Sequence, residues 1–60
     1  MLSLNRREGQ TIVVTVGTER ITFYVAAVRG DTVRVGVDAA PHIAVHRGEV
    51  QDRIDREAAA

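Results

Sequence analysis

The stretch Ile21-Thr22-Phe23-Tyr24-Val25-Ala26-Ala27-Val28 is the longest apolar run in this chain of 60 residues. It lies between two segments that contain glycine, Gly17-Thr18-Glu19 and Arg29-Gly30-Asp31-Thr32, and glycine is a strong marker of turns. A short apolar run between two turns is typical of a buried strand. The sequence therefore predicts a central strand over residues 21–28.

The segments on either side of this run also have the character of strands. Residues 11–16, Thr-Ile-Val-Val-Thr-Val, are all β-branched, which disfavours a helix and suits a pleated surface. Residues 33–37, Val-Arg-Val-Gly-Val, place their valines on one side of a strand. The middle of the chain is thus expected to form strands over 11–16, 21–28 and 33–37, joined by turns.

The two ends of this region carry a shared pattern. Successive strand residues face opposite ways. On one side, residues 2–7 present two leucines and then Arg6, and residues 42–47 present isoleucine, valine and then Arg47. The pattern predicts a first strand over 2–7 and a fifth over 42–47, each with an arginine at the end of an apolar row.

Only the end of the chain has helical periodicity. Val50 and Ile54 lie four residues apart, and acid-before-base pairs recur at the same spacing, which stabilises an isolated helix by about 0.2–0.5 kcal/mol per pair. Gly48 stands where an N-cap is expected. The sequence predicts a helix over 49–58.

These elements place the chain in the mainly β class, as one domain over residues 1–60 with five short strands and a C-terminal helix. A chain of this size buries only about 60% of its unfolded surface, and it has no cysteine with which to form a disulfide. An isolated five-stranded sheet would also expose two unpaired edges. Pairing the terminal strands with a second subunit would cover those edges and enlarge the core, so we expect a strand-sharing homodimer.

The charge of the chain gives little direction. Eight cationic residues, all arginine, balance eight acids, for a formal net charge of zero. The arginine fork suits phosphates and base edges, although a genome rich in G and C also favours arginine codons. Neutrality argues against a general polyanion binder held by counterion release, and it leaves room for a small basic site.

Metal binding and catalysis are not expected. His42 and His46 lie four residues apart, which on a strand is about 13 Å and too far for one metal ion. Ser3 is the only serine and has no glycine elbow around it. Phe23 and Tyr24 are adjacent and face opposite ways, so they form no stacking platform for bases. We predict that the protein is not an enzyme and uses no cofactor.

The start of the chain indicates a cytoplasmic protein. Met1-Leu2-Ser3-Leu4 is followed at once by Asn5-Arg6-Arg7-Glu8, unlike a signal peptide. No apolar run approaches the roughly 20 residues that a membrane-spanning helix needs. We therefore expect a soluble protein.

The arginines on the predicted strands, Arg6, Arg7 and Arg47, have two interpretations. They are either ordinary solvated residues near strand ends or the charged part of an anion site. Composition and periodicity do not decide between the two.

Three segments resemble the carbon storage regulator family, CsrA/RsmA. Residues 1–12, MLSLNRREGQTI, resemble its opening M-L-[ILV]-L-[ST]-R-[RK]-x-G-E-x-[IL]. Residues 28–39, VRGDTVRVGVDA, resemble its V-x-G-x-x-V-[RK]-[IL]-G-[IV]-x-A segment. Residues 43–50, IAVHRGEV, resemble its V-x-V-H-R-x-E-[IV] segment. The segments cover most of the chain in the family's order.

The resemblance implies an interlocked homodimer in which the first and fifth strands pair with strands of the partner. It implies RNA sites where the first strand of one subunit lies beside the fifth strand of the other. The ligands would be GGA motifs in the 5′ leaders and hairpin loops of mRNA, with repressed translation or altered message stability as the result. Antagonist small RNAs with GGA loops, and a protein antagonist such as a flagellar assembly factor, are further partners that it implies.

By matching position, the resemblance assigns RNA contacts to two groups of residues, which are Leu4, Asn5, Arg6 and Arg7, and then Ile43, Val45, His46, Arg47 and Val50. Ala39 and Ala40, in the loop before the fifth strand, are weaker candidates. Backbone groups would read much of the GGA base edges, because sequence-specific RNA recognition favours unstacked loop bases.

The chain departs from the family pattern at several positions. Ser3 replaces an aliphatic residue, Asn5 replaces Ser or Thr, and the segment 13–21 is longer than usual. Pro41 comes one position late, and Gly48 replaces an acid. Together with the net neutrality, the last two departures motivate an alternative function, a dimeric protein-interaction module with a degenerate RNA site.

Overall fold

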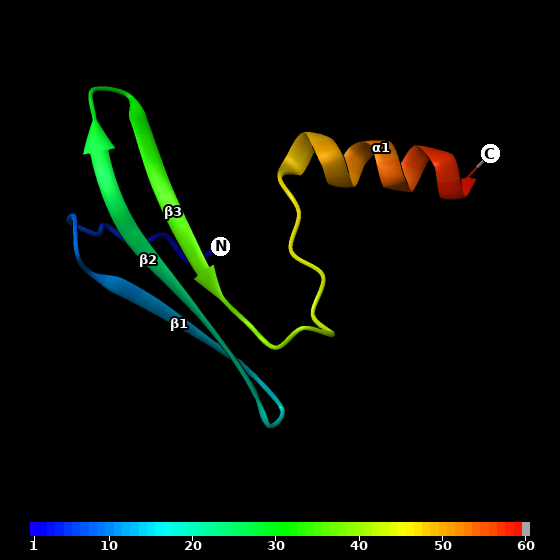
Figure 1. Ribbon diagram of the computed structural model, residues 1–60, viewed down its shortest axis with the longest axis horizontal. Coiled ribbons are helices and arrows are strands. Elements are labelled where there is room, and N and C mark those ends of the chain that lie inside the picture. The colour runs from blue at the N-terminus through cyan, green and yellow to red at the C-terminus, as the bar shows by residue number, and fades with distance from the viewer. Residues whose placement is uncertain (60) are drawn as a thin grey trace.

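The computed structural model describes residues 1–59 as one antiparallel sheet followed by one helix (Figure 1). The strand order is β1-β2-β3. The elements are β1 at Thr11–Val16, β2 at Glu19–Arg29, β3 at Thr32–Asp38 and α1 at Gly48–Ala59. The predicted central strand is confirmed, because β2 lies in the middle of the sheet and pairs with both neighbours.

Two short turns connect the strands. Gly17 and Gly30 each open a two-residue turn with φ near +59°, a left-handed conformation that glycine adopts without a steric penalty. Because the first turn is so short, Glu19 already pairs with Val16. Strand β2 therefore begins two residues before the predicted start at residue 21, and Glu19 belongs to the strand instead of the turn.

The register of the sheet brings the apolar side chains of all three strands to one face. Ile12, Phe23 and Val37 lie opposite one another on β1, β2 and β3, and directly paired residues project to the same side. A bulge between Val25 and Ala27 keeps the pattern of β2 in step with that of β3. The resulting surface, which we call the apolar face, consists of Ile12, Val14, Val16, Ile21, Phe23, Val25, Val28, Val33, Val35 and Val37.

The opposite face of the sheet is mostly polar. Tyr24 lies on this face opposite Gly36, as predicted from its position next to Phe23. A Cβ atom added to Gly36 would approach Cδ2 of Tyr24 to 2.7 Å, so the ring occupies the space above the glycine. Arg34 lies on the same face as Gly36, so the prediction that the valines of β3 share the other side of the strand is confirmed.

Nothing within the described residues covers the apolar face. No residue of 1–59 is buried, and Val16 and Val35 are 62% and 52% exposed. Helix α1 contacts none of the three strands (Figure 1). The radius of gyration is 13.9 Å, whereas a compact domain of this length has about 10 Å. The single chain thus supplies one side of a hydrophobic core without the other.

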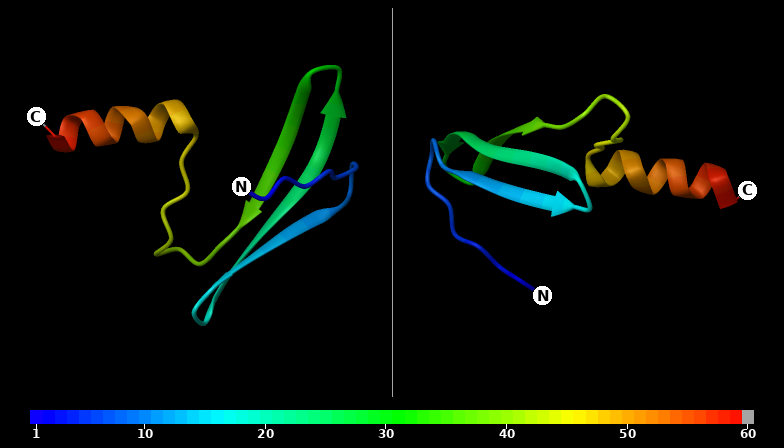
Figure 2. Two further views of the ribbon diagram at one scale, coloured as in Figure 1. Left: turned by 180° about the vertical axis from the view of Figure 1, so that it is seen from behind. Right: turned by 90° about the horizontal axis from the view of Figure 1, so that it is seen from below.

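Residues 2–7 and 42–47, predicted as strands, lie outside regular strands in the single chain. A strand exists only through hydrogen bonds to a neighbour, and within residues 1–59 no further strand pairs with the outer edge of β1 or of β3. Residues 2–7 pass behind the sheet in Figure 1 and in front of it in the left panel of Figure 2, so they leave the sheet on one face. The prediction of five strands is therefore not met by one chain alone.

The start of the segment 42–47 is a turn. The amide of Ile43 donates to the carbonyl of Ala40 at 2.9 Å, which makes Pro41 and His42 the central residues of a four-residue turn. Proline pre-sets the φ angle that the first central position of such a turn requires. The prediction that a strand begins at His42 is therefore wrong, and residues 44–47 have no regular secondary structure.

The helix begins one residue earlier than predicted. The carbonyl of Arg47 accepts hydrogen bonds from the amides of Val50 at 3.0 Å and Gln51 at 2.9 Å. The residue whose carbonyl takes the first helical bonds is the N-cap, so Arg47 holds that position and Gly48 is the first residue of α1. No helix formed by residues 1–59 has the length and apolar character that crossing a bilayer requires.

Candidate nucleic-acid interface

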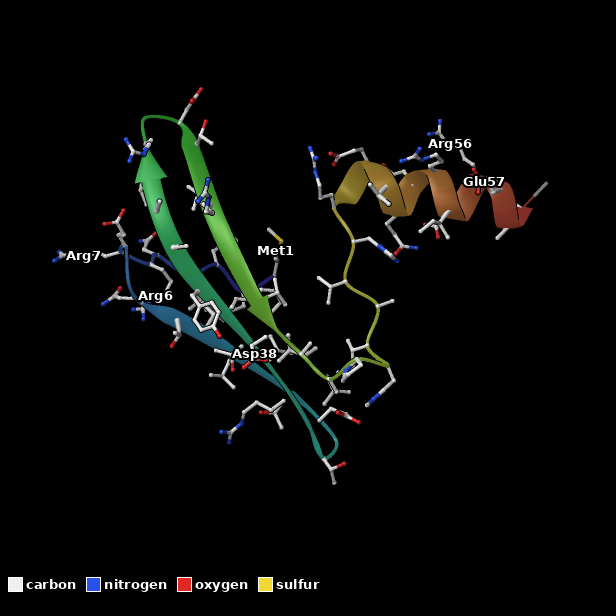
Figure 3. All side chains as sticks on the ribbon, in the orientation of Figure 1. Met1, Arg6, Arg7, Asp38, Arg56 and Glu57 are labelled. Atoms are coloured by element: carbon white, nitrogen blue, oxygen red, sulfur yellow. The ribbon has the colours of Figure 1, made fainter. Side chains whose placement is uncertain are left out.

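The first predicted site segment, Leu4 to Arg7, lies fully in solvent just before the sheet. All four residues are exposed, and Leu4 keeps 54% of its surface accessible. The side chains of Arg6 and Arg7 lie near the start of β1 (Figure 3). Nε of Arg6 donates to the carbonyl of Asn5 at 2.8 Å. Within residues 1–59 neither guanidinium has a carboxylate partner, so both remain able to bind an anion.

Gln10 holds the backbone of Arg7 from two sides. The amide of Arg7 donates to Oε1 of Gln10 at 2.9 Å, and the amide of Gln10 donates to the carbonyl of Arg7 at 3.0 Å. Gln10 itself is attached to β2, because its carbonyl accepts from the amide of Val25 at 3.0 Å. The end of the first segment is thus anchored to the central strand.

Glu8 completes this anchor. Its Oε1 accepts a hydrogen bond from the amide of Val28 at 3.1 Å, beyond the bulge of β2. The adjacent amide of Gly9 donates to the carbonyl of Val25 at 2.8 Å. The anchoring role of residues 8–10 was not predicted, because their side-chain types carry no specific signal for it.

The second predicted site segment follows β3 and leads into α1. Val45 and His46 are exposed, whereas Ile43 and Val50 are half-buried. The weaker candidates Ala39 and Ala40 are half-buried directly after β3. The turn at Pro41 separates these two alanines from residues 44–47.

Arg47 differs from the arginines of the first segment. Its guanidinium forms an ion pair with the carboxylate of Glu49, through one terminal nitrogen. Both side chains are strongly exposed, at 82% and 62%. Exposed pairs of this kind contribute little to stability, about 0–1 kcal/mol. The pair places a carboxylate beside the guanidinium of Arg47, and sequence reasoning did not predict this neighbour.

His42 has a structural contact instead of a site role. Its Nε2 lies 2.9 Å from Oε1 of Glu19, the first residue of β2. This contact ties the Pro41 turn to the hairpin between β1 and β2. No cluster of three or more metal-ligating side chains lies within the described residues 1–59.

The two site segments are not brought together in one chain. No hydrogen bond within residues 1–59 joins residues 2–7 to residues 42–47. The first segment precedes the edge strand β1, and the second follows the edge strand β3. A site that contains both segments would therefore need a second copy of the chain.

Comparison with known proteins identifies the family. Residues 1–56 match the family described as CsrA, global regulator protein family. That match includes both site segments, the whole sheet and most of α1.

Several curated relatives bear the name translational regulator CsrA. The protein from Desulfitobacterium hafniense strain DSM 10664 is 39% identical over 57 residues, which are 95% of this chain and 70% of the relative. The one from Rhodopirellula baltica is 43% identical over 56 residues, 93% of this chain and 76% of the relative. The one from Exiguobacterium sp. is 40% identical, covering 95% and 72% of the two chains. The chain belongs to the CsrA family of global regulator proteins.

Proposed function

We propose that this protein is a homodimeric post-transcriptional regulator in the cytoplasm, which binds GGA motifs in the 5′ leaders and hairpin loops of mRNA. Binding there would repress translation or alter the stability of the message. One observation carries the proposal. The two segments to which the family resemblance assigns RNA contacts hold exposed arginines and have no strand partner within residues 1–59.

The proposed dimer follows from the uncovered apolar face. Fully burying one valine, isoleucine or phenylalanine stabilises a fold by about 1.5–3 kcal/mol, and the face presents ten such side chains. A second copy would cover it with an identical surface. Residues 2–7 and 44–47 of the partner would add to the open edges at β1 and β3, as strands do when they extend an existing sheet.

In this dimer the RNA site would be shared between subunits. Arg47 and Val45 of one chain would lie beside Leu4 and Arg6 of the other. The exposed apolar side chains of Leu4 and Val45 suit contact with unstacked bases. Backbone amides and carbonyls near the strand ends would read base edges, and the guanidinium groups would add charged hydrogen bonds.

The names of the relatives support the same class of function, since each is called a translational regulator. That name points to RNA as the ligand instead of a small-molecule substrate. Small RNAs that present several GGA loops would compete for the same site, and a protein antagonist would act by covering it.

The direct test is binding of a labelled RNA hairpin that displays GGA in its loop, compared with a hairpin of the same stem and a scrambled loop. Fluorescence anisotropy at fixed salt gives both dissociation constants, and light scattering gives the mass of the free protein. We expect a dimer that prefers the GGA loop. Equal affinity for both loops would contradict the proposed RNA specificity.

A dimer without affinity for any GGA loop would favour the alternative of a protein-interaction module. The turn at Pro41 is the feature that could cause this outcome, because it places His42 in a turn instead of a strand. The double variant Ala40→Pro/Pro41→Ala, which moves the proline back by one position, would then restore RNA binding if the position of the proline is responsible.

A further inference from the structure

The three site arginines differ in their electrostatic surroundings. Within residues 1–59, Arg6 and Arg7 have no carboxylate partner, whereas Arg47 is paired with Glu49. The nearest acid along the chain to Arg6 and Arg7, Glu8, directs an oxygen to the backbone of β2. The proposed site thus contains two free cations and one neutralised cation.

Pairing with Glu49 changes what Arg47 can bind. A guanidinium has five N–H donors, and Glu49 contacts only one terminal nitrogen. The remaining donors can still reach uncharged acceptors such as the oxygen and nitrogen atoms of base edges. Binding to a phosphate is different, because the carboxylate repels the phosphate and cancels the charge that would release counterions.

Glu49 is held in position to exert this effect. Arg47 is the N-cap of α1, and its carbonyl accepts from the amides of Val50 and Gln51. Glu49 lies in the first turn of the same helix, where a negative charge interacts favourably with the helix dipole. The start of the helix therefore keeps the two residues close to each other, and their side chains form the ion pair at the surface.

We propose that Glu49 is a specificity-determining residue of the RNA site: it neutralises Arg47, confines it to base edges and prevents it from acting as a general phosphate contact. The proposal rests on the proposed function of the protein as an RNA-binding regulator. In this arrangement, Arg6 and Arg7 attract the phosphate backbone of the RNA, and Arg47 distinguishes its base sequence.

The test is the variant Glu49→Gln, which keeps the shape of the side chain and removes its charge. Binding of the GGA hairpin and of its scrambled control is measured over a series of salt concentrations. One added phosphate contact steepens the salt dependence by about 0.7 in a log–log plot, which corresponds to about fivefold in affinity at 0.1 M salt. We expect this gain for the scrambled hairpin and a smaller gain for the GGA hairpin.

The matched control is Glu57→Gln. Glu57 is also an exposed acid on α1, and it lies toward the opposite end of the helix from Arg47 (Figure 3). The Glu57→Gln substitution changes the net charge by the same amount as Glu49→Gln. Because it leaves the pair of Arg47 and Glu49 intact, the ratio of the two affinities should not change. The double variant Arg47→Gln/Glu49→Gln should lose the steeper salt dependence, because the new phosphate contact is assigned to Arg47.

The outcomes separate this inference from the proposed function. If the unaltered protein does not prefer GGA, the proposed function fails. If it prefers GGA and Glu49→Gln leaves the ratio of affinities unchanged, or strengthens both hairpins equally, the inference alone is overturned. Weaker GGA binding with an unchanged scrambled control would also overturn it, since Glu49 would then serve to position Arg47.

Discussion

The strand meander of residues 11–38 and the segments that flank it differ in how their backbones are paired. The meander satisfies its backbone through β1, β2 and β3, and it leaves a whole apolar face uncovered. The flanking segments 1–7 and 39–47 carry the site arginines Arg6, Arg7 and Arg47 and pair with no strand in the described part of the chain, residues 1–59. The meander, which folds through local contacts, is thus separate from the segments that would bind RNA. In the proposed dimer, the same second copy would complete both.

Placing a charge on the apolar face should have the largest effect, because it would disrupt both the dimer and RNA binding. Val14→Asp removes apolar burial of about 1.5–3 kcal/mol in the dimer and adds the cost of desolvating a carboxylate. We expect loss of the dimer and, with it, of GGA binding, measured by light scattering and anisotropy. The control Thr15→Asp changes the neighbouring residue on the other face, opposite Arg20. A dimeric Val14→Asp variant would show that the apolar face is not the interface.

Removing the arginine of the second segment should weaken binding without unfolding the meander. We expect Arg47→Ala to cost about 1–3 kcal/mol of binding free energy, as for the loss of a charged hydrogen-bonding group. Arg53→Ala, on the exposed surface of α1, is the charge-matched control. The circular dichroism spectrum should not change in either variant, and a collapsed spectrum of Arg47→Ala would identify a structural role for that residue.

Loosening the anchor of the first segment should have a smaller effect. Gln10→Ala removes the side-chain acceptor for the amide of Arg7, and such a bond contributes about 0.5–1.5 kcal/mol. We expect faster hydrogen exchange at the Arg7 amide and a reduction of GGA affinity by up to about tenfold. Gln51→Ala, which removes a contact to Asp55 within the helix, should alter neither quantity.

The contact between His42 and Glu19 should matter least. Both side chains are partly exposed, at 66% and 42%, and pairs of this kind contribute less than about 1 kcal/mol. We expect His42→Gln to lower the midpoint of urea unfolding slightly and to leave GGA binding intact. A large loss of RNA affinity would instead assign His42 to the site.

The sequence allowed the meander to be predicted because its signals are local. β-branched runs, alternating valines and glycine turns act within a few residues, and β1, β2 and β3 were all expected. The segments 2–7 and 42–47 were interpreted with the same rules, yet their strand character depends on a neighbour that one chain does not provide. Pro41 did carry a local signal for the turn through Ile43, which the alternating pattern of residues 42–47 obscured.

The residues of the candidate site were predictable from motifs in the sequence, whereas their contacts were not. Residues such as Arg6 and Arg47 were named from the family resemblance, and the structure shows both of them exposed. Two neighbours follow no spacing rule: Gln10, which holds the backbone of Arg7, and Glu49, which pairs with Arg47. Their contacts arise from the anchor to β2 and from the cap of α1.

By itself, the sequence determined the three central strands, the helix, the family and the two arginine-bearing segments, because propensity, periodicity and motif are properties of consecutive residues. Only the tertiary structure decided that the apolar residues gather on one exposed face, that Arg47 caps α1, and that Arg47 pairs with Glu49 while Arg6 and Arg7 have no carboxylate partner within residues 1–59. Those features depend on register, on backbone hydrogen bonds and on the contacts of individual charges. They therefore arise only in the folded chain.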